Sequence, residues 1–471
     1  MSPCLLPLPD QHSVMFSGAR SGECGLTWSQ ERLWRMMRDE PDGRRNNLHL
    51  HIPLPENLAP TVNRVLDILR MVLIRHDSLR TTYKVDNTGG HMQLIHGQGN
   101  LSVEVLPLSA VESDGTWDDL VGAMRQHPDF VMDELQVRVA LFTRAGMVRH
   151  LVLVFSPIAL DDWGRAIVEE EIYQLLEPDG VLEPDPWQPI QQRAWEQSVE
   201  GQRRSNAALV HLSKQLAEPM PPLFPAAYPK PSAAPGATHP FSEAYMDSAV
   251  VSAAGRTLAG RYRVSFYTVL MASVLASVSV RTGSAHLQFT TVVNNRFSHR
   301  SKGGVGPLTQ TATVSVELER KNYAEIVKAT LNALLTAYRN SRYDPHALDA
   351  LESAQSGRNA TTSDSPRLFI NLTNSRNATV DLAPRETAQR LRELTARTTF
   401  KWREKPMQGH ADLYIGARPS AASTSFHSRA NTRVVPREEI RGTLFGVEAI
   451  LLAAAEGRQM SSADLQAIVR G

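Results

Sequence analysis

Hydrophobic residues recur at two spacings along the chain, and each spacing predicts a different kind of element. Behind Pro60, apolar residues at every third or fourth position over 62–73 predict an amphipathic helix that ends near the charged turn 75–77. Two short strand-like runs, 81–85 and 92–96, then flank an Asn-Thr-Gly-Gly turn and predict a hairpin with a longer loop. Helices and strands therefore alternate early in the chain.

Two further helix starts carry capping signals. Thr27 followed by Gln30 has the spacing of a capping box and predicts a helix that continues through Met37. The run LVLVF at 151–155 is apolar on both faces, which is typical of a central strand. It leads to Asp161 and Asp162, where an aspartate can cap the apolar helix that follows.

The second half repeats this pattern of helices and strands. The apolar run 264–280 contains four serines and falls short of a comfortable bilayer span, so it predicts a buried helix. Further strands are expected at 287–293, 311–316, 368–373 and 413–416, and a last apolar helix at 444–455. Mixed elements in two halves predict an α/β (α+β) fold with two lobes.

Proline and small residues over 217–240 exclude a regular element and divide the chain. We therefore expect a loose N-terminal lead-in over 1–17, an N-terminal lobe over 18–216, a connection over 217–240 and a C-terminal lobe over 241–471.

Composition narrows the classes of partner. The 471 residues are 42% hydrophobic and 21% charged, which suits a folded protein with a large core. Lysine and arginine number 50 against 49 acidic residues, so we expect neither a nucleic-acid nor a membrane partner. The two cysteines, Cys4 and Cys24, make no disulfide framework, and the N-terminus lacks the basic segment of a secretory signal. A cytoplasmic location is the simplest expectation.

Histidines give little sign of a metal centre. His49 and His51 alternate along a strand-like segment and would share one face, which is the minimum for sharing a metal ion. No third ligand can be named, so we predict ordinary histidines and no metal site. His76 lies at a helix end and is interpreted as structural.

Five segments carry a resemblance to a known family when taken together. They are LTWSQERLW (26–34), IRHDSLRTTY (74–83), RHLVLVFSPIALDDW (149–163), VVNNR (292–296) and GGVGPLTQT (303–311). In order and spacing they resemble the conserved blocks of the condensation domains of nonribosomal peptide synthetases. The resemblance implies two chloramphenicol-acetyltransferase-like lobes in a V-shaped pseudodimer with a central tunnel. It also implies a peptidyl or acyl carrier protein as partner, with substrates on its phosphopantetheine arm and no cofactor bound by this chain.

The third block departs from the family where the chemistry should be. The family reads His-His-x-x-x-Asp-Gly-Trp there, and the alignment puts Ser156 and Pro157 at the histidines and Asp162 at the glycine. Proline has no titratable side chain, so it cannot take the proton that a histidine would take. Ser156 could act as a nucleophile only beside a base that the sequence does not specify.

Two functions follow from the resemblance, and the sequence leaves open whether the chain is an enzyme. The first is a stand-alone condensation-like protein that binds carrier-tethered intermediates without histidine-dependent amide formation and recruits a tailoring oxygenase, as the similar X domains of glycopeptide synthetases do. The second is an atypical acyltransferase that forms an amide or ester by proximity, or with Asp162 as base.

The resemblance also assigns roles to residues around the third block. Asp161 and Arg296 match a pair that the family joins by a salt bridge beneath the active site, and with Arg80 they are interpreted as structural. Substrate contact is assigned to Trp163, Asn371 and Asn374. For the two asparagines, an ordinary strand with outward-facing amides is the alternative.

Overall fold

The chain forms two compact units. The computed structural model describes residues 9–39, 47–58, 60–109, 117, 122, 124, 130, 132–182, 185–217, 223–224, 241–356, 367–372, 386–403 and 411–470. The first unit comprises Met1–Arg204 with Asn294–Gln310, and the second comprises Ser205–Val293 with Thr311–Gly471. Asn374 and most of the proline-rich segment 217–240 lie outside the described residues.

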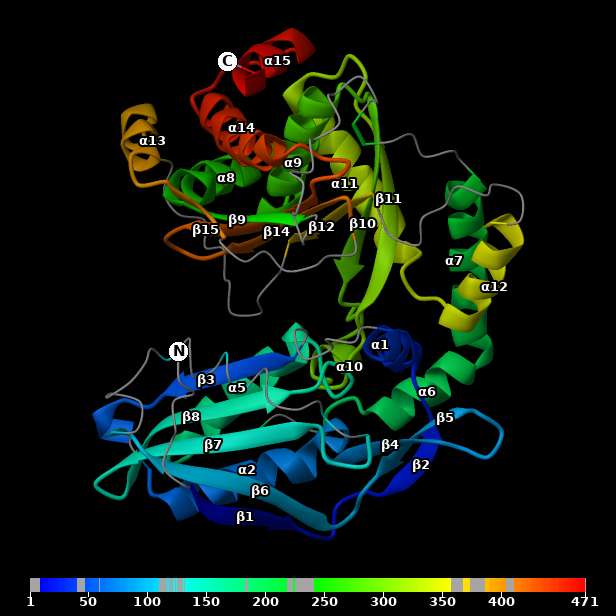
Figure 1. Cartoon of the computed structure of the whole chain (residues 1–471), viewed down its shortest axis with the longest axis vertical. Helices are drawn as coiled ribbons and strands as arrows, with labels where there is room; N and C mark the ends of the chain where they lie inside the picture. Colours follow the sequence, from blue (N-terminus) through cyan, green and yellow to red (C-terminus); the bar gives the residue numbers. More distant parts are fainter. Residues whose placement is uncertain are drawn as a thin grey trace. The chain divides into compact units, whose positions relative to one another are not determined.

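The first unit is built on a sheet in the order β1-β6-β7-β8-β3, with a second, three-stranded sheet in the order β2-β5-β4. Its elements are β1 (Asp10–Phe16), β2 (Gly22–Gly25), α1 (Trp28–Asp39), β3 (Leu48–Pro53), η2 (Glu56–Leu58), α2 (Val62–Arg75), η3 (Asp77–Arg80), β4 (Thr81–Val85), β5 (His91–Ile95), β6 (Gly99–Pro107), β7 (Val137–Arg144), β8 (Met147–Phe155), α5 (Asp162–Leu176), α6 (Pro189–Gln197) and α10 (His299–Lys302). Helices α2 and α5 cover one face of the larger sheet (Figure 1).

Several predicted elements of this unit are confirmed. Helix α2 starts after Thr61, whose hydroxyl accepts a hydrogen bond from the Arg64 amide, and strands β4 and β5 form the predicted antiparallel hairpin. The capping box of α1 is present in both directions between Thr27 and Gln30. Strand β8 lies between β7 and β3, and Leu151 to Phe155 are almost completely buried, as expected for a central strand.

The prediction of a loose lead-in over 1–17 is wrong for Asp10–Phe16, which is strand β1. It pairs antiparallel with β6 along its whole length at the edge of the larger sheet. Val14 and Phe16, two residues apart, are 0% and 3% exposed and enter the core of the first unit. The prolines just before them hid a period-two pattern that was too short to recognise in the sequence.

The second unit contains a sheet in the order β11-β10-β12-β14-β15-β9-β13. Its elements are β9 (Phe241–Ser248), α8 (Ala249–Tyr262), α9 (Phe266–Thr282), β10 (His286–Val293), β11 (Gln310–Glu317), α11 (Tyr323–Arg339), α12 (Pro345–Ser356), β12 (Leu368–Leu372), α13 (Ala388–Thr395), β13 (Thr399–Trp402), β14 (Leu413–Pro419), β15 (Thr424–Asn431), α14 (Arg437–Ala455) and α15 (Ser462–Arg470). Helices α8, α9 and α14 lie over one face of β9, β14 and β15 (Figure 1).

The apolar run in the second half is the buried helix that the sequence predicts. Ser265 caps α9, and its side-chain oxygen accepts a hydrogen bond from the Thr268 amide. Three of the serines that the run contains donate to backbone carbonyls: Ser273 and Ser279 to carbonyls nearby in the chain, and Ser277 to that of Thr443 on α14. Among the described residues no single helix is long and apolar enough to span a membrane. Helices α8 and α9 together reach that length and composition, but the pair is bent by 108°.

The units differ from the predicted lobes in one respect that matters for the site. The prediction placed Asn294–Gln310 in the C-terminal lobe, whereas this segment packs in the first unit, and the other division falls within α7 (Val199–Ala217). Val305, 1% exposed, joins the core of the first unit, and its carbonyl lies against Gly164 of α5. A methyl group at Gly164 would overlap that carbonyl, so a glycine is required for this close approach.

Replacement of Gly164 by alanine therefore tests how the segment is anchored. We expect Gly164→Ala to lower the free energy of unfolding by about 1–3 kcal/mol, because the added methyl group overpacks a rigid backbone contact. The matched control is Gly260→Ala, since Gly260 also lies in a helix but faces open space. Urea unfolding should show no loss for the control. Equal effects of the two substitutions would contradict the proposed contact.

Candidate functional site

The candidate site is the loop that joins β8 to α5, where the predicted site residues gather. Residues 156–160 are all buried. The Tyr83 hydroxyl donates to the Ile158 carbonyl at 3.1 Å, and the Ala159 amide donates to the Ser156 carbonyl at 3.0 Å. The backbone of this loop is therefore held within the core of the first unit.

Ser156 is buried in surroundings that do not activate a hydroxyl. Its amide donates to the Gln136 carbonyl at 3.1 Å, and its hydroxyl lies 4.0 Å from the sulfur of Met37. An activated serine needs a base within about 2.6–3.2 Å. In the part of the chain that the structure describes, no base contacts this hydroxyl.

Asp161 is the best-connected side chain of the loop. One carboxylate oxygen accepts the Gly164 amide at 3.0 Å, so Asp161, and not Asp162, is the aspartate that caps α5. The other accepts from Arg296 at 2.7 Å and from the Leu308 amide at 3.1 Å. The Thr309 hydroxyl donates to the same oxygen at 2.7 Å. A single carboxylate thus joins the start of a helix to a segment almost 150 residues away.

Arg296 completes this connection with all of its donors. Besides Asp161, its guanidinium donates to the carbonyls of Asn294, Gly304 and Gly306 at 2.9–3.3 Å. Its side chain is 0% exposed. A buried guanidinium is tolerated only when its charge is paired and its five N–H groups are satisfied, and both conditions hold here.

The electrostatics of the pair favour the charged state. Burial raises the pKa of the Asp161 carboxyl, but the Arg296 guanidinium and the hydrogen bonds from Arg296, Gly164 and Thr309 outweigh it and hold that pKa below its ordinary value. The aspartate therefore remains ionised at neutral pH. An ionised carboxylate with this many donors serves as a framework group and has little capacity left to take a proton from a substrate.

The two residues after Asp161 are less enclosed. The Asp162 side chain, the first of α5, is 41% exposed and lies 3.3 Å from the Arg165 guanidinium. The indole of Trp163 donates to the Lys302 carbonyl at 2.9 Å, which ties α5 to the segment that contains α10. The Trp163 indole is therefore hydrogen-bonded within the first unit, where its ring also packs against the core.

Residues 20–468 match the condensation domain family. The chain belongs to the condensation domain family. A linear gramicidin synthase of Brevibacillus parabrevis is 30% identical over 176 residues, which are 36% of this chain and 3% of that protein. Cyclosporin synthetase of Tolypocladium inflatum is 24% identical over 320 residues, which are 66% of this chain and 2% of that protein. The chain thus spans only a small part of these relatives.

Solved condensation domains show the same fold. The condensation domain of the monacolin K polyketide synthase MokA aligns with a TM-score of 0.72 at 14% identity, over 94% of this chain and 99% of that one. The X-domain from teicoplanin biosynthesis aligns with a TM-score of 0.65 at 17% identity, over 95% and 98%. The predicted α/β fold of the condensation type is therefore confirmed.

The loop has a serine and a proline at 156 and 157, where the resemblance predicts histidines. Ser156 and Pro157 occupy the positions that the resemblance assigns to them, and both are buried. Neither residue offers a base, since Pro157 has no polar side-chain atom and the Ser156 hydroxyl faces sulfur. The geometry therefore supports proton transfer by neither Ser156 nor Pro157.

Arg80 has the structural environment that the sequence predicts. It is 0% exposed, contacts the Asp77 carboxylate at 2.7 Å and donates to the carbonyls of Leu73 and Arg20 at 2.6 and 2.8 Å. It also donates to the His96 carbonyl. These bonds join the end of α2 to the hairpin of β4 and β5. They position no group for chemistry.

The predicted histidines are engaged with neighbours. His51 Nε2 lies 3.0 Å from His150 Nδ1, and the two rings stack. His76 is buried and lies 2.6 Å from Glu171, whose other oxygen accepts from Arg75. Among the described residues no cluster of three metal-ligating side chains occurs.

Asn371 lies in the second unit, on β12 beside Gly416 of β14, and is half-buried. Asn374 lies outside the described residues. The structure therefore places Asn371 on a sheet face, as both alternatives for it require, and decides nothing between them.

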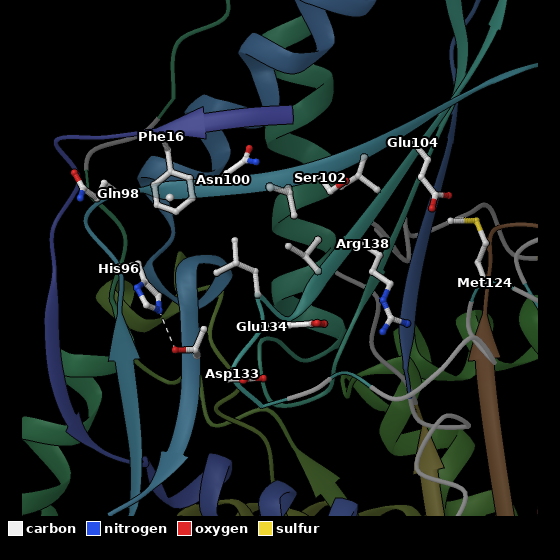
Figure 2. A pocket seen from close by; sticks show the side chains of 16 residues that line it. Phe16, His96, Gln98, Asn100, Ser102, Glu104, Met124, Asp133, Glu134 and Arg138 are labelled. Atoms are coloured by element: carbon white, nitrogen blue, oxygen red, sulfur yellow. Dashed lines mark hydrogen bonds between the residues drawn. The ribbon is translucent and has the colours of Figure 1, made fainter. Parts of the chain in front are cut away.

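A cavity of about 630 Å³ lies elsewhere in the first unit (Figure 2). Phe16, His96 and Arg138 project around it with Glu104 and Glu134, and the His96 ring bonds the Thr82 hydroxyl at 2.9 Å. None of the predicted site residues lines this cavity. The cavity is therefore distinct from the candidate site at the loop between β8 and α5.

Thr309 and the Leu308 amide are the site groups that sequence reasoning missed. Both belong to GGVGPLTQT, which was recognised only as a block of the resemblance. Their distance of almost 150 residues from Asp161 leaves no local signal, because hydrogen bonds to a capping aspartate normally come from the next turn of its own helix.

The neighbouring aspartates 161 and 162 allow a matched test of this electrostatic assignment. We expect Asp161→Asn to cost roughly 3–5 kcal/mol at pH 7, because Arg296 would be left buried without its counter-charge. Since the folded-state pKa of Asp161 is depressed, its contribution exists above the unfolded value of about 3.9 and disappears as pH falls through the lower folded value.

Unfolding measured from pH 7 downwards should therefore show the two proteins converging in acid. Asp162→Asn is the control, since its half-exposed side chain should contribute little at any pH. A constant difference between wild type and Asp161→Asn across this range would contradict the assignment.

Proposed function

We propose that the protein binds carrier-tethered acyl or peptidyl intermediates of nonribosomal peptide assembly, without amide formation by the histidine motif. One observation carries this proposal. The framework of Asp161, Arg296 and Thr309 is complete, whereas the histidine positions hold a buried serine and a proline. The fold has kept the framework of a condensation domain without the group that its motif uses for proton transfer.

The relatives support the class of substrate. Two of them are named as a linear gramicidin synthase and a cyclosporin synthetase, and the chain matches short parts of both. Condensation domains from such assemblies receive substrates as thioesters on phosphopantetheine, so the proposed substrates are presented in this form and no cofactor resides in the chain. A cytoplasmic location follows from this role.

A tailoring oxygenase is the second proposed partner. A solved complex of the X-domain and OxyB from teicoplanin biosynthesis aligns with this chain at a TM-score of 0.63 and 17% identity, over 95% of this chain. Because Pro157 cannot transfer a proton, we propose that a partner enzyme carries out the chemistry on the bound intermediate. The near-balance of 50 basic and 49 acidic residues supports neither nucleic acid nor a membrane as partner.

An atypical acyltransferase is the second candidate function, and the exposure of Asp162 favours it. Its side chain is 41% exposed at the start of α5, where a substrate could reach it. The carboxylate would take the proton of an amine or hydroxyl acceptor while proximity supplied most of the acceleration. Arg165, 3.3 Å away, already pairs with it and limits this role.

Reconstitution with an aminoacyl carrier protein and an amine acceptor distinguishes the two candidates. We expect the unaltered protein to bind the loaded carrier, as measured by titration calorimetry. Any turnover should be unchanged in Ser156→Ala and Asp162→Asn, because neither side chain serves as the base.

The variants Pro157→His and Asp162→Gly restore the family residues and serve as the comparison. Product from the unaltered protein that disappears in Asp162→Asn would establish the acyltransferase and reject the first proposal. No binding of any loaded carrier would reject both.

A further inference from the structure

The second unit has a polar face on the side of its sheet opposite the helices. On β9 and β15, Ala244, Met246 and Phe426 enter the helix-covered core. Because side chains alternate along a strand, Tyr245 and His427 project from the opposite face. The strand register places one residue from each of five neighbouring strands in a row across this face. The row contains Asn371, Gly416, His427, Tyr245 and Lys401.

A buried carboxylate lies beside this row. The side chain of Glu243 on β9 is 0% exposed, and its Oε1 lies 2.5 Å from Nε2 of His427 on β15. The histidine side chain itself is 32% exposed. A deeply buried carboxylate therefore meets a histidine whose ring still reaches solvent.

Arg403 and Tyr245 also donate hydrogen bonds to the carboxylate of Glu243, and the Arg429 guanidinium lies 4.0 Å from it. Arg403 donates to Oε1 at 3.2 Å, and the Tyr245 hydroxyl donates to the same oxygen at 3.1 Å. Burial, and then the charge of Glu243, raise the pKa of Tyr245, so its hydroxyl keeps its proton as a donor. Since Arg403 already supplies a counter-charge, the histidine is not required to neutralise this glutamate.

Aromatic rings hold the imidazole in position. The Tyr245 ring stacks on His427 at 5.0 Å with an interplanar angle of 12°, and the Tyr414 ring lies 5.6 Å away. A side chain at Gly416 would come within 2.8 Å of the Tyr414 hydroxyl, so the glycine leaves room for that phenol to lie over the row. The histidine is thus fixed by a carboxylate and two rings, as a positioned catalytic group requires.

The tautomer follows from these contacts. An ionised carboxylate only accepts hydrogen bonds, so Nε2 carries the proton and Nδ1 keeps its lone pair. Nδ1 has no hydrogen-bond partner among the residues that the structure describes.

We propose that His427 is a general base for acyl transfer, oriented by Glu243 as a positioning residue. This inference rests on the proposed function, which supplies a thioester as the acyl donor. Nδ1 takes the proton from a hydroxyl or amine acceptor as its oxygen or nitrogen bonds to the thioester carbonyl carbon. The carbon–sulfur bond then breaks, and the departing thiolate takes the proton back from Nδ1. The products are an ester or amide and a free thiol.

Thioester hydrolysis tests the inference without a carrier protein, because water serves as the acceptor. The probe is the octanoyl thioester of N-acetylcysteamine, with release of free thiol measured on the full chain. We expect His427→Ala to lower kcat by about 10²-fold with little change in KM, since general bases contribute on that order. His286→Ala is the matched control, because His286 is an exposed histidine at the start of β10 outside the row. It should leave the rate unchanged.

Two results would overturn the inference. One is an equal rate for His427→Ala and the unaltered protein, with both folded by thermal melting. The other is ¹⁵N NMR of the histidine-labelled protein in which Nδ1 of His427 carries the proton. The expected spectrum has the proton on Nε2, and Glu243→Gln should reduce that preference and lower kcat more than KM.

These outcomes separate the inference from the proposed function. Hydrolysis that depends on His427, together with no binding of loaded carrier proteins, would reject the proposed function alone. Binding of carriers with hydrolysis that is independent of His427 would reject only the inference.

Discussion

The ion pair between Asp161 and Arg296 is the interaction on which the first unit depends. It joins the start of α5 to a segment that follows β10 in the chain, and it uses every donor of the guanidinium. Charges buried this deeply are stabilising only as a complete set, since removal of one partner leaves the other without compensation. The pair therefore constrains the loop between β8 and α5 to one backbone path. That path in turn requires Gly164, because the Val305 carbonyl lies directly against it.

This constraint explains how the loop keeps its backbone path with a serine and a proline at 156 and 157. The backbone path is determined by Asp161 and by buried neighbours, and neither depends on the side chains at 156 and 157. A serine beside a methionine sulfur and a proline fit the same buried space. The path of this loop is thus separable from the side chains at 156 and 157, because the framework pair uses other residues.

The two buried carboxylates, Asp161 and Glu243, differ in whether their hydrogen-bond partners reach solvent. Asp161 accepts hydrogen bonds from Gly164, Arg296, Leu308 and Thr309, all within the first unit, so it holds structure together. Glu243 is compensated by Arg403 and Tyr245 among others, and one of its partners, His427, still reaches solvent. Burial alone therefore does not mark a group as structural. The deciding property is whether one of its partners is part-exposed and has a ring nitrogen that bonds no described residue, as His427 has.

Local physics allowed much of the fold to be predicted from the sequence. The capping box of Thr27 and Gln30, the cap at Asp161 and the apolar strand 151–155 each depend on neighbours a few residues away, so their patterns are visible in the chain. The sequence by itself also determined the absence of a base at Pro157, because no fold can supply a proton-accepting group to a proline side chain.

Only the tertiary structure decided the rest. Strand β1, the packing of Asn294–Gln310 in the first unit and the meeting of Glu243 with His427 all depend on residues far apart in the chain. Such contacts leave no local period, because strand register and buried charge pairing are settled when separate elements pack together.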